Sequence, residues 1–240
     1  KVMITTRPYT NSIYQTSITD YYNGVLKVGD GESYGTGNLL YDGRSLLTAA
    51  HVFDGRNYDR LKIYLYDGVN NFTAYANVNI HSRYDDYDVN DDIAIVTFEQ
   101  TFDSMYQRYQ LYRDNSEINK KYTAVGYGDV GTGYTGETFA DEIYKLKTTN
   151  TFDADLKTLM DYANETLPWK PKKDAILISD FDNGYSNTDI IGSLSNKPHY
   201  GTGDMEGLIA SGDSGGAAFI NGLIAGVTSY SADIGPSKTA

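Results

Sequence analysis

The chain has 240 residues, a formal net charge of −12 and a pI near 4.6. This charge repels phosphate backbones and acidic lipids, so nucleic acids and membrane surfaces are disfavoured as partners. Hydrophobic residues make up 40% and charged residues 22%, as in folded globular proteins. There is no cysteine, and no apolar run reaches the roughly 20 residues of a membrane span.

Short apolar or alternating runs separated by Gly, Asn and Asp clusters predict β-strands along most of the chain. In chain order these runs are residues 24–28, 37–40, 45–48, 61–65, 93–96, 122–125, 175–178 and 223–227. The dipeptides Asp42-Gly43, Asp67-Gly68 and Asn221-Gly222 are turn signals at their ends. The pattern predicts an all-β fold, either a sandwich or barrels.

Only one stretch has helical periodicity. Within residues 154–167, Leu156, Leu159, Met160 and Ala163 recur at helical spacing, which predicts a helical insertion on the surface. A stretch rich in Gly and Thr, residues 126–136, is a candidate junction between two halves. Because the chain stops soon after Tyr230, we expect the natural protein to continue past Ala240.

A serine among glycines is the first candidate for chemistry. In Gly212-Asp213-Ser214-Gly215-Gly216 the backbone can take a tight turn that exposes the Ser214 side chain and aims successive N–H groups into one small space. Nucleophilic hydrolysis by serine needs such a hydroxyl, together with an imidazole and a carboxylate. An ordinary Gly-rich hairpin loop is the alternative.

His51 and Asp92 are the candidates for those two partners. His51 is one of 3 histidines and ends the apolar run that begins at residue 46. Asp92 directly precedes the strand predicted at 93–96, where a buried carboxylate needs a partner such as an imidazole N–H. A hydrogen-bonded core histidine and a polar loop are the alternatives.

The acidic stretch that ends at Asp92 has a further interpretation as a calcium loop. Residues 85–90 supply Asp85, Asp86, Asp88 and Asn90, and residues 67–71 form a second candidate turn. Neither run has a complete ligand pattern, so calcium binding at either run stays an open alternative and no cofactor is predicted.

Three segments, in this order along the chain, together resemble a known family. Thr48-Ala49-Ala50-His51, Asn90-Asp91-Asp92-Ile93-Ala94-Ile95 and Gly212-Asp213-Ser214-Gly215-Gly216 resemble the signature segments of the trypsin-like (chymotrypsin-fold) serine peptidases. The resemblance implies two antiparallel Greek-key β-barrels with a short helical insertion in the second half. It implies one peptidase domain over 1–240, with a first barrel at 1–120 and a second at 121–240, and a cleft between them.

The resemblance also implies a role for each residue. His51 would be the general base, Asp92 would orient it, and Ser214 would be the nucleophile. The backbone N–H groups of Gly212 and Ser214 would form the oxyanion hole. Ser229 and Tyr230 would bind the main chain of a substrate as an added strand.

The resemblance also implies which residue selects the side chain at the cleavage site. In the family, the residue six positions before the nucleophile lies at the base of the primary substrate pocket, and in this chain that residue is Leu208. An apolar base predicts cleavage after an uncharged, apolar side chain, because a buried Lys or Arg would lack a carboxylate partner. Glu206 would reverse this if it reached into the pocket, and Ser231 would narrow the pocket where the family usually has glycine.

Activation in the family uses a new N-terminal ammonium that pairs with the aspartate before the nucleophile. Here that aspartate is Asp213, and the residue carrying the ammonium would be Val2 after cleavage behind Lys1. An internal partner for Asp213 is the alternative, as in some family members.

The resemblance thus implies a monomeric serine endopeptidase that acts on proteins or peptides, secreted by a bacterium. Two alternatives stay open. One is a catalytically silent binding module on the same scaffold. The other is an HtrA-like quality-control peptidase, although those generally carry asparagine where this chain has Asp213.

Overall fold

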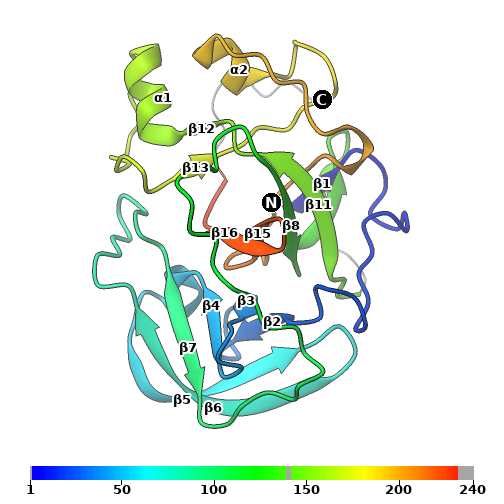
Figure 1. Cartoon of the computed structure of the whole chain (residues 1–240), viewed down its shortest axis with the longest axis vertical. Coiled ribbons are helices and arrows are strands. Elements are labelled where there is room, and N and C mark those ends of the chain that lie inside the picture. Colours follow the sequence, from blue (N-terminus) through cyan, green and yellow to red (C-terminus); the bar gives the residue numbers. More distant parts are fainter. Residues whose placement is uncertain (1, 139–141, 232–240) are drawn as a thin grey trace.

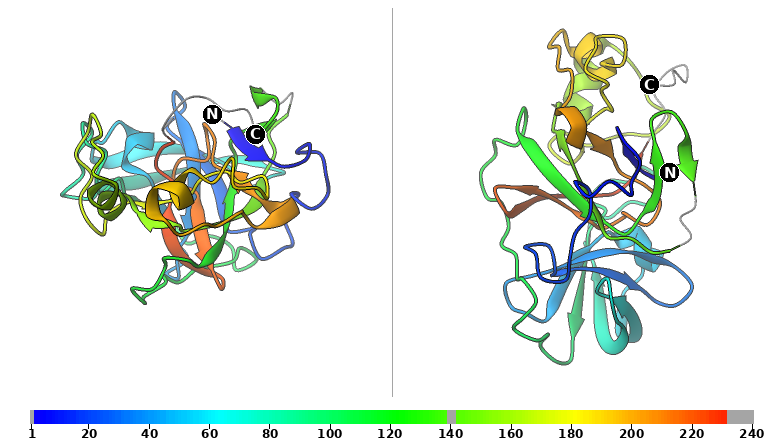
Figure 2. Two further views of the ribbon diagram at one scale, coloured as in Figure 1. Left: turned by 90° about the horizontal axis from the view of Figure 1, so that it is seen from above. Right: turned by 90° about the vertical axis from the view of Figure 1, so that its right-hand side faces the viewer.

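The molecule has two β-rich halves, one above the other along its longest axis (Figure 1). The structure is a computed structural model that describes residues 2–138 and 142–231. Two short α-helices lie at the end of the second half that is farthest from the first half, and the view turned by 90° agrees (Figure 2). Among these residues no helix combines the length and apolar character that a membrane crossing requires.

The first half is a closed barrel of six antiparallel strands in the order β2-β3-β4-β7-β6-β5. Its strands are β2 (Val25–Gly29), β3 (Tyr34–Leu39), β4 (Ser45–Thr48), β5 (Tyr58–Tyr66), β6 (Asn71–Ile80) and β7 (Ala94–Phe98). Alternate residues of β5 to β7 point inward, as in Ile63 and Leu65, and fill the barrel together with Leu26, Leu46 and Phe98. This alternation produces one buried and one exposed face on each strand.

The second half consists of two four-stranded sheets. One has the order β11-β8-β15-β16 and the other the order β10-β9-β1-β14. The strands are β1 (Val2–Thr5), β8 (Lys121–Gly126), β9 (Asp129–Thr132), β10 (Gly136–Thr138), β11 (Leu146–Thr151), β14 (Gly207–Leu208), β15 (Ala217–Ile220) and β16 (Leu223–Val227). Asn221 and Gly222 both have positive φ and join β15 to β16, as the turn signal predicts.

The N-terminal strand belongs to the second half, although it comes first in the sequence. β1 pairs in parallel with β9, with Val2 opposite Asp129, and antiparallel with β14, with Ile4 opposite Leu208. The proposed division at residue 120 therefore does not describe residues 2–5. The expected junction at 126–136 is wrong as well, because that stretch contains β9 and the turn into β10, while the chain leaves the barrel after Phe98.

The predicted helical insertion is shorter than expected. α1 (Leu156–Ala163) begins at its N-cap Asp155, whose carboxylate accepts the Thr158 N–H, and ends at Asn164 in the left-handed conformation. Before it, β12 (Ala154–Asp155) pairs with β13 (Leu177–Ile178). A second helix, α2 (Ile190–Ser195), has only six residues, too few to produce a periodic pattern.

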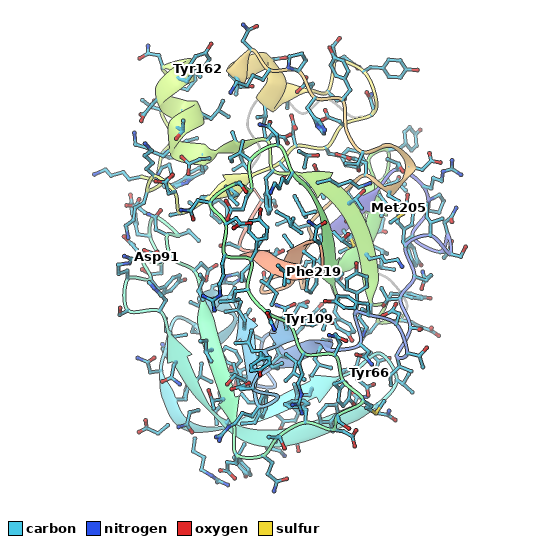
Figure 3. The ribbon with its side chains drawn as sticks, viewed as in Figure 1. Tyr66, Asp91, Tyr109, Tyr162, Met205 and Phe219 are labelled. Carbon is cyan, nitrogen blue, oxygen red and sulfur yellow. The ribbon has the colours of Figure 1, made fainter. Side chains whose placement is uncertain are left out.

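Aromatic residues fill the contact between the two halves. Tyr109, from the connection between them, lies with its ring centroid 4.8 Å from that of Phe219 on β15 (Figure 3). Val25 and Leu47 of the barrel pack into the same cluster as Val125 and Phe219. The expected all-β fold of two barrel-like halves with a helical insertion is confirmed.

Candidate active site

His51 lies where the barrel chain turns out of strand β4. It belongs to the 3₁₀-helix η1 (Ala50–Phe53), which ends at Asp54 in the left-handed conformation. The ring is about one-third exposed, with Nδ1 2.7 Å from Asp92 Oδ2 and Nε2 2.8 Å from Ser214 Oγ. The backbone N–H of His51 donates to Asp92 Oδ1 as well, so one carboxylate fixes both the backbone and the ring. The three side chains singled out from the sequence therefore form one continuous chain of contacts.

Ser214 sits on a turn that only glycines permit. Gly212 has φ +92° and Gly215 has φ +86°. A Cβ on Gly215 would lie 2.1 Å from Thr48 Oγ1 and 2.2 Å from the Thr36 carbonyl oxygen, so no larger residue fits. The glycine-rich sequence is thus a steric requirement of this turn.

The N–H groups beside Ser214 are available to a ligand. Within the described part of the chain, neither the Gly212 nor the Ser214 N–H donates a hydrogen bond, whereas the Gly215 and Gly216 N–H groups are occupied by Thr228 and Asp213 carbonyls. Free N–H groups flanking a nucleophile are what an oxyanion requires.

Strand β3 of the barrel holds the serine turn in place. Thr36 Oγ1 donates to the Gly212 carbonyl, and the Thr36 N–H donates to the Ser214 carbonyl. Asn38, fully buried, donates from Nδ2 to the Gly215 carbonyl and accepts the Ala217 N–H at Oδ1. Sequence reasoning missed these two residues, although polar side chains on an otherwise apolar strand are a usable signal.

Asp92 is buried and stays ionised. Burial alone raises the pKa of its carboxyl, but the hydrogen bonds from His51 and Ser229 and the His51 charge outweigh burial and lower that pKa. Ser229 Oγ donates to Asp92 Oδ2, the same oxygen that His51 Nδ1 faces. The Ser229 side chain thus contacts Asp92, while the predicted pairing of residues 229 and 230 with the main chain of a substrate stays a prediction.

Tyr230 extends the site toward the helical end of the molecule. Trp169 Nε1 donates to the Tyr230 hydroxyl at 3.0 Å, and the two rings meet edge to face. Trp169 was not predicted, and its place in an irregular segment between α1 and β13 left no periodic signal.

The loop before Asp92 is clamped to the second half. Asn90 is 1% exposed, donates from Nδ2 to the Lys170 carbonyl and accepts the Lys172 N–H at Oδ1. Asp88 accepts the Lys170 N–H, and Asp91, on the outer side of the molecule in Figure 3, pairs with Lys172. Asp88 and Asn90, two residues of the candidate calcium loop, therefore bond to protein groups. In the other candidate turn, Asp67 accepts the Val69 and Asn70 N–H groups.

The residues predicted to line the substrate pocket differ in how deeply they are buried. Leu208 is half-buried in β14, and Ser231 is the last residue that the structure describes. Glu206 is fully buried, and its Oε2 accepts the Thr202 N–H and hydroxyl.

Asp213 is bound by backbone amides. Its Oδ1 accepts the Gly128 N–H and its Oδ2 accepts the Ala210 N–H. Burial raises the pKa of Asp213 to about 7, although these two donors partly oppose it. Val2 lies in β1, and since Lys1 precedes it, its nitrogen is a peptide nitrogen here. Pairing of Asp213 with a Val2 ammonium therefore needs prior cleavage and stays a prediction.

A barrel-based scaffold with a contiguous Ser, His and Asp set defines a serine-peptidase-like protein. The family model for trypsin matches residues 11–166, more than half of the chain, and the chain belongs to this family. A comparison with curated protein sequences found no match.

Solved structures agree with this assignment at the level of the fold. Mouse neuropsin, a serine protease, is 18% identical with a TM-score of 0.63, over 92% of this chain and 87% of that one. The scabies mite inactivated protease paralogue S-D1 is 17% identical with a TM-score of 0.60, over 94% and 87% of the two chains.

Proposed function

We propose that this chain is an active serine endopeptidase that hydrolyses peptide bonds through an acyl-enzyme. The observation that carries the proposal is the unbroken line of contacts from Asp92 through His51 to Ser214, with distances of 2.7 and 2.8 Å. This spacing is within the hydrogen-bond reach required of a nucleophile, its base and the group that orients the base.

The chemistry follows from that order. Ser214 Oγ attacks the peptide carbonyl carbon while its proton passes to His51 Nε2, and the negative charge moves to the carbonyl oxygen. The free Gly212 and Ser214 N–H groups stabilise that oxyanion. His51 then gives the proton to the leaving amine, the C–N bond breaks, and an ester with Ser214 remains. Water gives a proton to His51 as it attacks the ester carbon. The bond from Ser214 Oγ to that carbon then breaks, His51 returns the proton to Ser214 Oγ, and the acid product leaves.

Asp92 serves this sequence by stabilising the imidazolium. Its buried carboxylate fixes the ring so that Nε2 faces Ser214, and its lowered pKa keeps it ionised as the ring takes up a proton. No step requires a metal ion or an organic cofactor.

We further propose an apolar preference at the cleavage site, since Leu208 stands where the family has the base of its pocket. Glu206 is held by Thr202 through one oxygen and is fully buried, which favours Leu208 over Glu206 as the group that meets the substrate. We propose that the enzyme acts outside a bacterial cell, as a monomer, on protein or peptide substrates.

Hydrolysis of an unfolded protein tests the function. The chain, assayed both as it stands and after cleavage behind Lys1, should degrade casein, and Ser214→Ala should reduce the rate by at least about 10³-fold. Fragments sequenced by mass spectrometry give the cleavage sites. A folded and processed chain that degrades casein no faster than Ser214→Ala would contradict the proposal and favour the silent binding module.

A further inference from the structure

A group of buried and partly buried acidic residues lies in the second half, outside the candidate triad. Its members come from the segments that follow β11 and β13, from the N-cap of α2 and from the residue before β14. We call this group the acidic cluster: Asp153, Asp180, Asp182, Asp189 and Glu206. Met205, which precedes Glu206, is labelled on this half in Figure 3.

Three members are close enough to share one ion. One carboxylate oxygen from each of Asp180, Asp182 and Asp189 lies within 4.8 Å of the others. Two oxygens bound to one calcium at about 2.4 Å each are at most about 4.8 Å apart, so the spacing suits a common ion. Glu206 adjoins Asp182, because a Cβ on Gly201 would lie 2.9 Å from Asp182 Cβ and 3.2 Å from Glu206 Cδ.

The cluster also contains unpartnered oxygens that are fully buried. In the described part of the chain, six buried side-chain polar atoms have no hydrogen-bond partner, and all six lie in or beside the cluster. They are Thr148 Oγ1, Asp153 Oδ2, Asp180 Oδ1, Asp182 Oδ1, His199 Nδ1 and Glu206 Oε1. The Asp182 side chain is 1% exposed, and Glu206 is 0% exposed. A buried carboxylate oxygen with no partner is costly, so four in one place indicate a missing positive charge.

The protein itself supplies little of that charge. Among the described ion pairs, only His199 approaches the cluster, with Nδ1 3.5 Å from Asp153 Oδ1 and 3.8 Å from Asp182 Oδ2. Its Nε2 contacts Thr151 Oγ1, and Asp189 uses both oxygens to accept the Gly192 and His199 N–H groups. Burial, together with repulsion between the carboxylates, raises the pKa of Asp153 and of Asp182 to about 8.

We propose that the acidic cluster binds one calcium ion, with Asp180, Asp182 and Asp189 as its protein ligands and water completing its shell. Calcium takes six to eight oxygens in flexible geometry and favours carboxylates, which matches these three donors. Asp153 and Glu206 lie beside the three ligands and add negative charge that the ion would offset. The ion would tie the segment that follows β13 to the N-cap of α2. This site is separate from the 67–71 and 85–90 runs.

Calorimetry and thermal unfolding of the full chain, stripped of metal with EDTA and then dialysed, test the proposal. We expect one calcium per chain with a Kd of about 0.1 mM, in the range of extracellular calcium sites. At about 10 mM CaCl₂, roughly 100 times that Kd, we expect Tm to rise by about 5 to 10 °C.

Asp182→Asn distinguishes a calcium ligand from a residue that only supports the fold. The amide keeps the shape but removes a charge, so calcium affinity should fall at least about tenfold. In EDTA at about pH 9, above the pKa of about 8, the same variant should unfold at a higher temperature than the wild type, because repulsion between ionised carboxylates is relieved. Glu206→Gln removes a negative charge beside the ion and retains an acceptor for Thr202, so calcium affinity should fall in this variant too. It replaces Asp182→Asn as the test variant if Asp182→Asn does not fold.

Asp86→Asn is the matched control, because it removes one charge from an exposed acidic loop. Its calcium affinity and its calcium-dependent Tm rise should equal those of the wild type. The proposal is overturned if the wild type shows neither binding heat nor a rise in Tm. It is also overturned if both cluster variants bind calcium as the wild type does, or if Asp86→Asn alone loses binding.

Discussion

Ser229 donates its hydroxyl to the Asp92 oxygen that His51 Nδ1 also faces. The carboxylate therefore has three donors, namely the His51 ring, the His51 backbone N–H and the Ser229 hydroxyl. The Asp92 side chain is only 3% exposed, and three donors outweigh its loss of hydration and keep it ionised. Ser229 thus positions the base by way of Asp92.

Ser229→Ala should lower kcat/KM about tenfold. Removal of one hydrogen bond to a charged group costs about 1.5 kcal/mol, and 1.4 kcal/mol corresponds to a factor of ten in rate. Steady-state kinetics on a chromogenic peptide measures this loss. Ser229→Thr retains a hydroxyl and should recover most of the activity, and equal activity of Ser229→Ala and the wild type would show that the contact does not matter.

Asn90→Ala should destabilise the fold by about 2 kcal/mol. The change leaves the Lys170 carbonyl and the Lys172 N–H without their partner at a buried position. Urea denaturation measures the difference. Asn77→Ala, at an exposed position of β6, is the control and should stay within about 0.5 kcal/mol of the wild type. Similar losses in the two variants would mean that the clamp adds no stability.

The sequence predicts a feature of this structure when the residues that determine the feature are neighbours in the chain. The turn at Asn221 and Gly222 and the serine turn both require positive φ at glycine, a property visible in a few neighbouring letters. The clamp by Asn90 and the support by Asn38 join residues about 80 and 180 positions apart, and no local pattern encodes such pairings.

In the chain that retains Lys1, ionisation of Asp213 should lower the free energy of unfolding as the pH rises. Its pKa is about 7 in the folded chain, against 3.8 for an ordinary Asp side chain, so the folded state holds this proton more tightly. The destabilisation is absent below about pH 4, grows as the pH rises and is complete above about pH 7.

Asp213→Asn, which cannot ionise, is the comparison for this effect. The free energy of unfolding of the wild type relative to Asp213→Asn should fall by on the order of 2 kcal/mol between about pH 5 and pH 8. Denaturant unfolding at each pH gives this difference, in which other titrating groups cancel. A difference that does not change with pH would be inconsistent with a buried, amide-bound carboxyl of raised pKa.

Leu208→Asp should move cleavage toward basic residues. A carboxylate at the proposed base of the pocket would pair with a bound Lys or Arg, while an apolar side chain would lose its apolar contact. We expect at least about a tenfold change in the ratio of kcat/KM for basic against apolar peptides, measured with a peptide library. Wild-type cleavage chiefly after Lys or Arg would show that Leu208 does not set the preference.

The acidic cluster and the position of the N-terminal strand could not be predicted from the sequence. Members of the cluster are spread from residue 153 to 206 in irregular segments, so only the folded chain brings them together. β1 is a four-residue strand whose partners lie more than 120 residues away in sequence, which explains why it was not placed with the second half.

Covalent labelling of Ser214 tests the central claim most directly. A fluorophosphonate probe reacts with a serine only when an adjacent base takes its proton, so the His51 contact at 2.8 Å predicts one adduct per chain, on the peptide that contains Ser214. Ser214→Ala should abolish the adduct, and His51→Ala should slow its formation by at least about 10³-fold. Absence of any adduct from the folded chain, both intact and cleaved behind Lys1, would contradict the account.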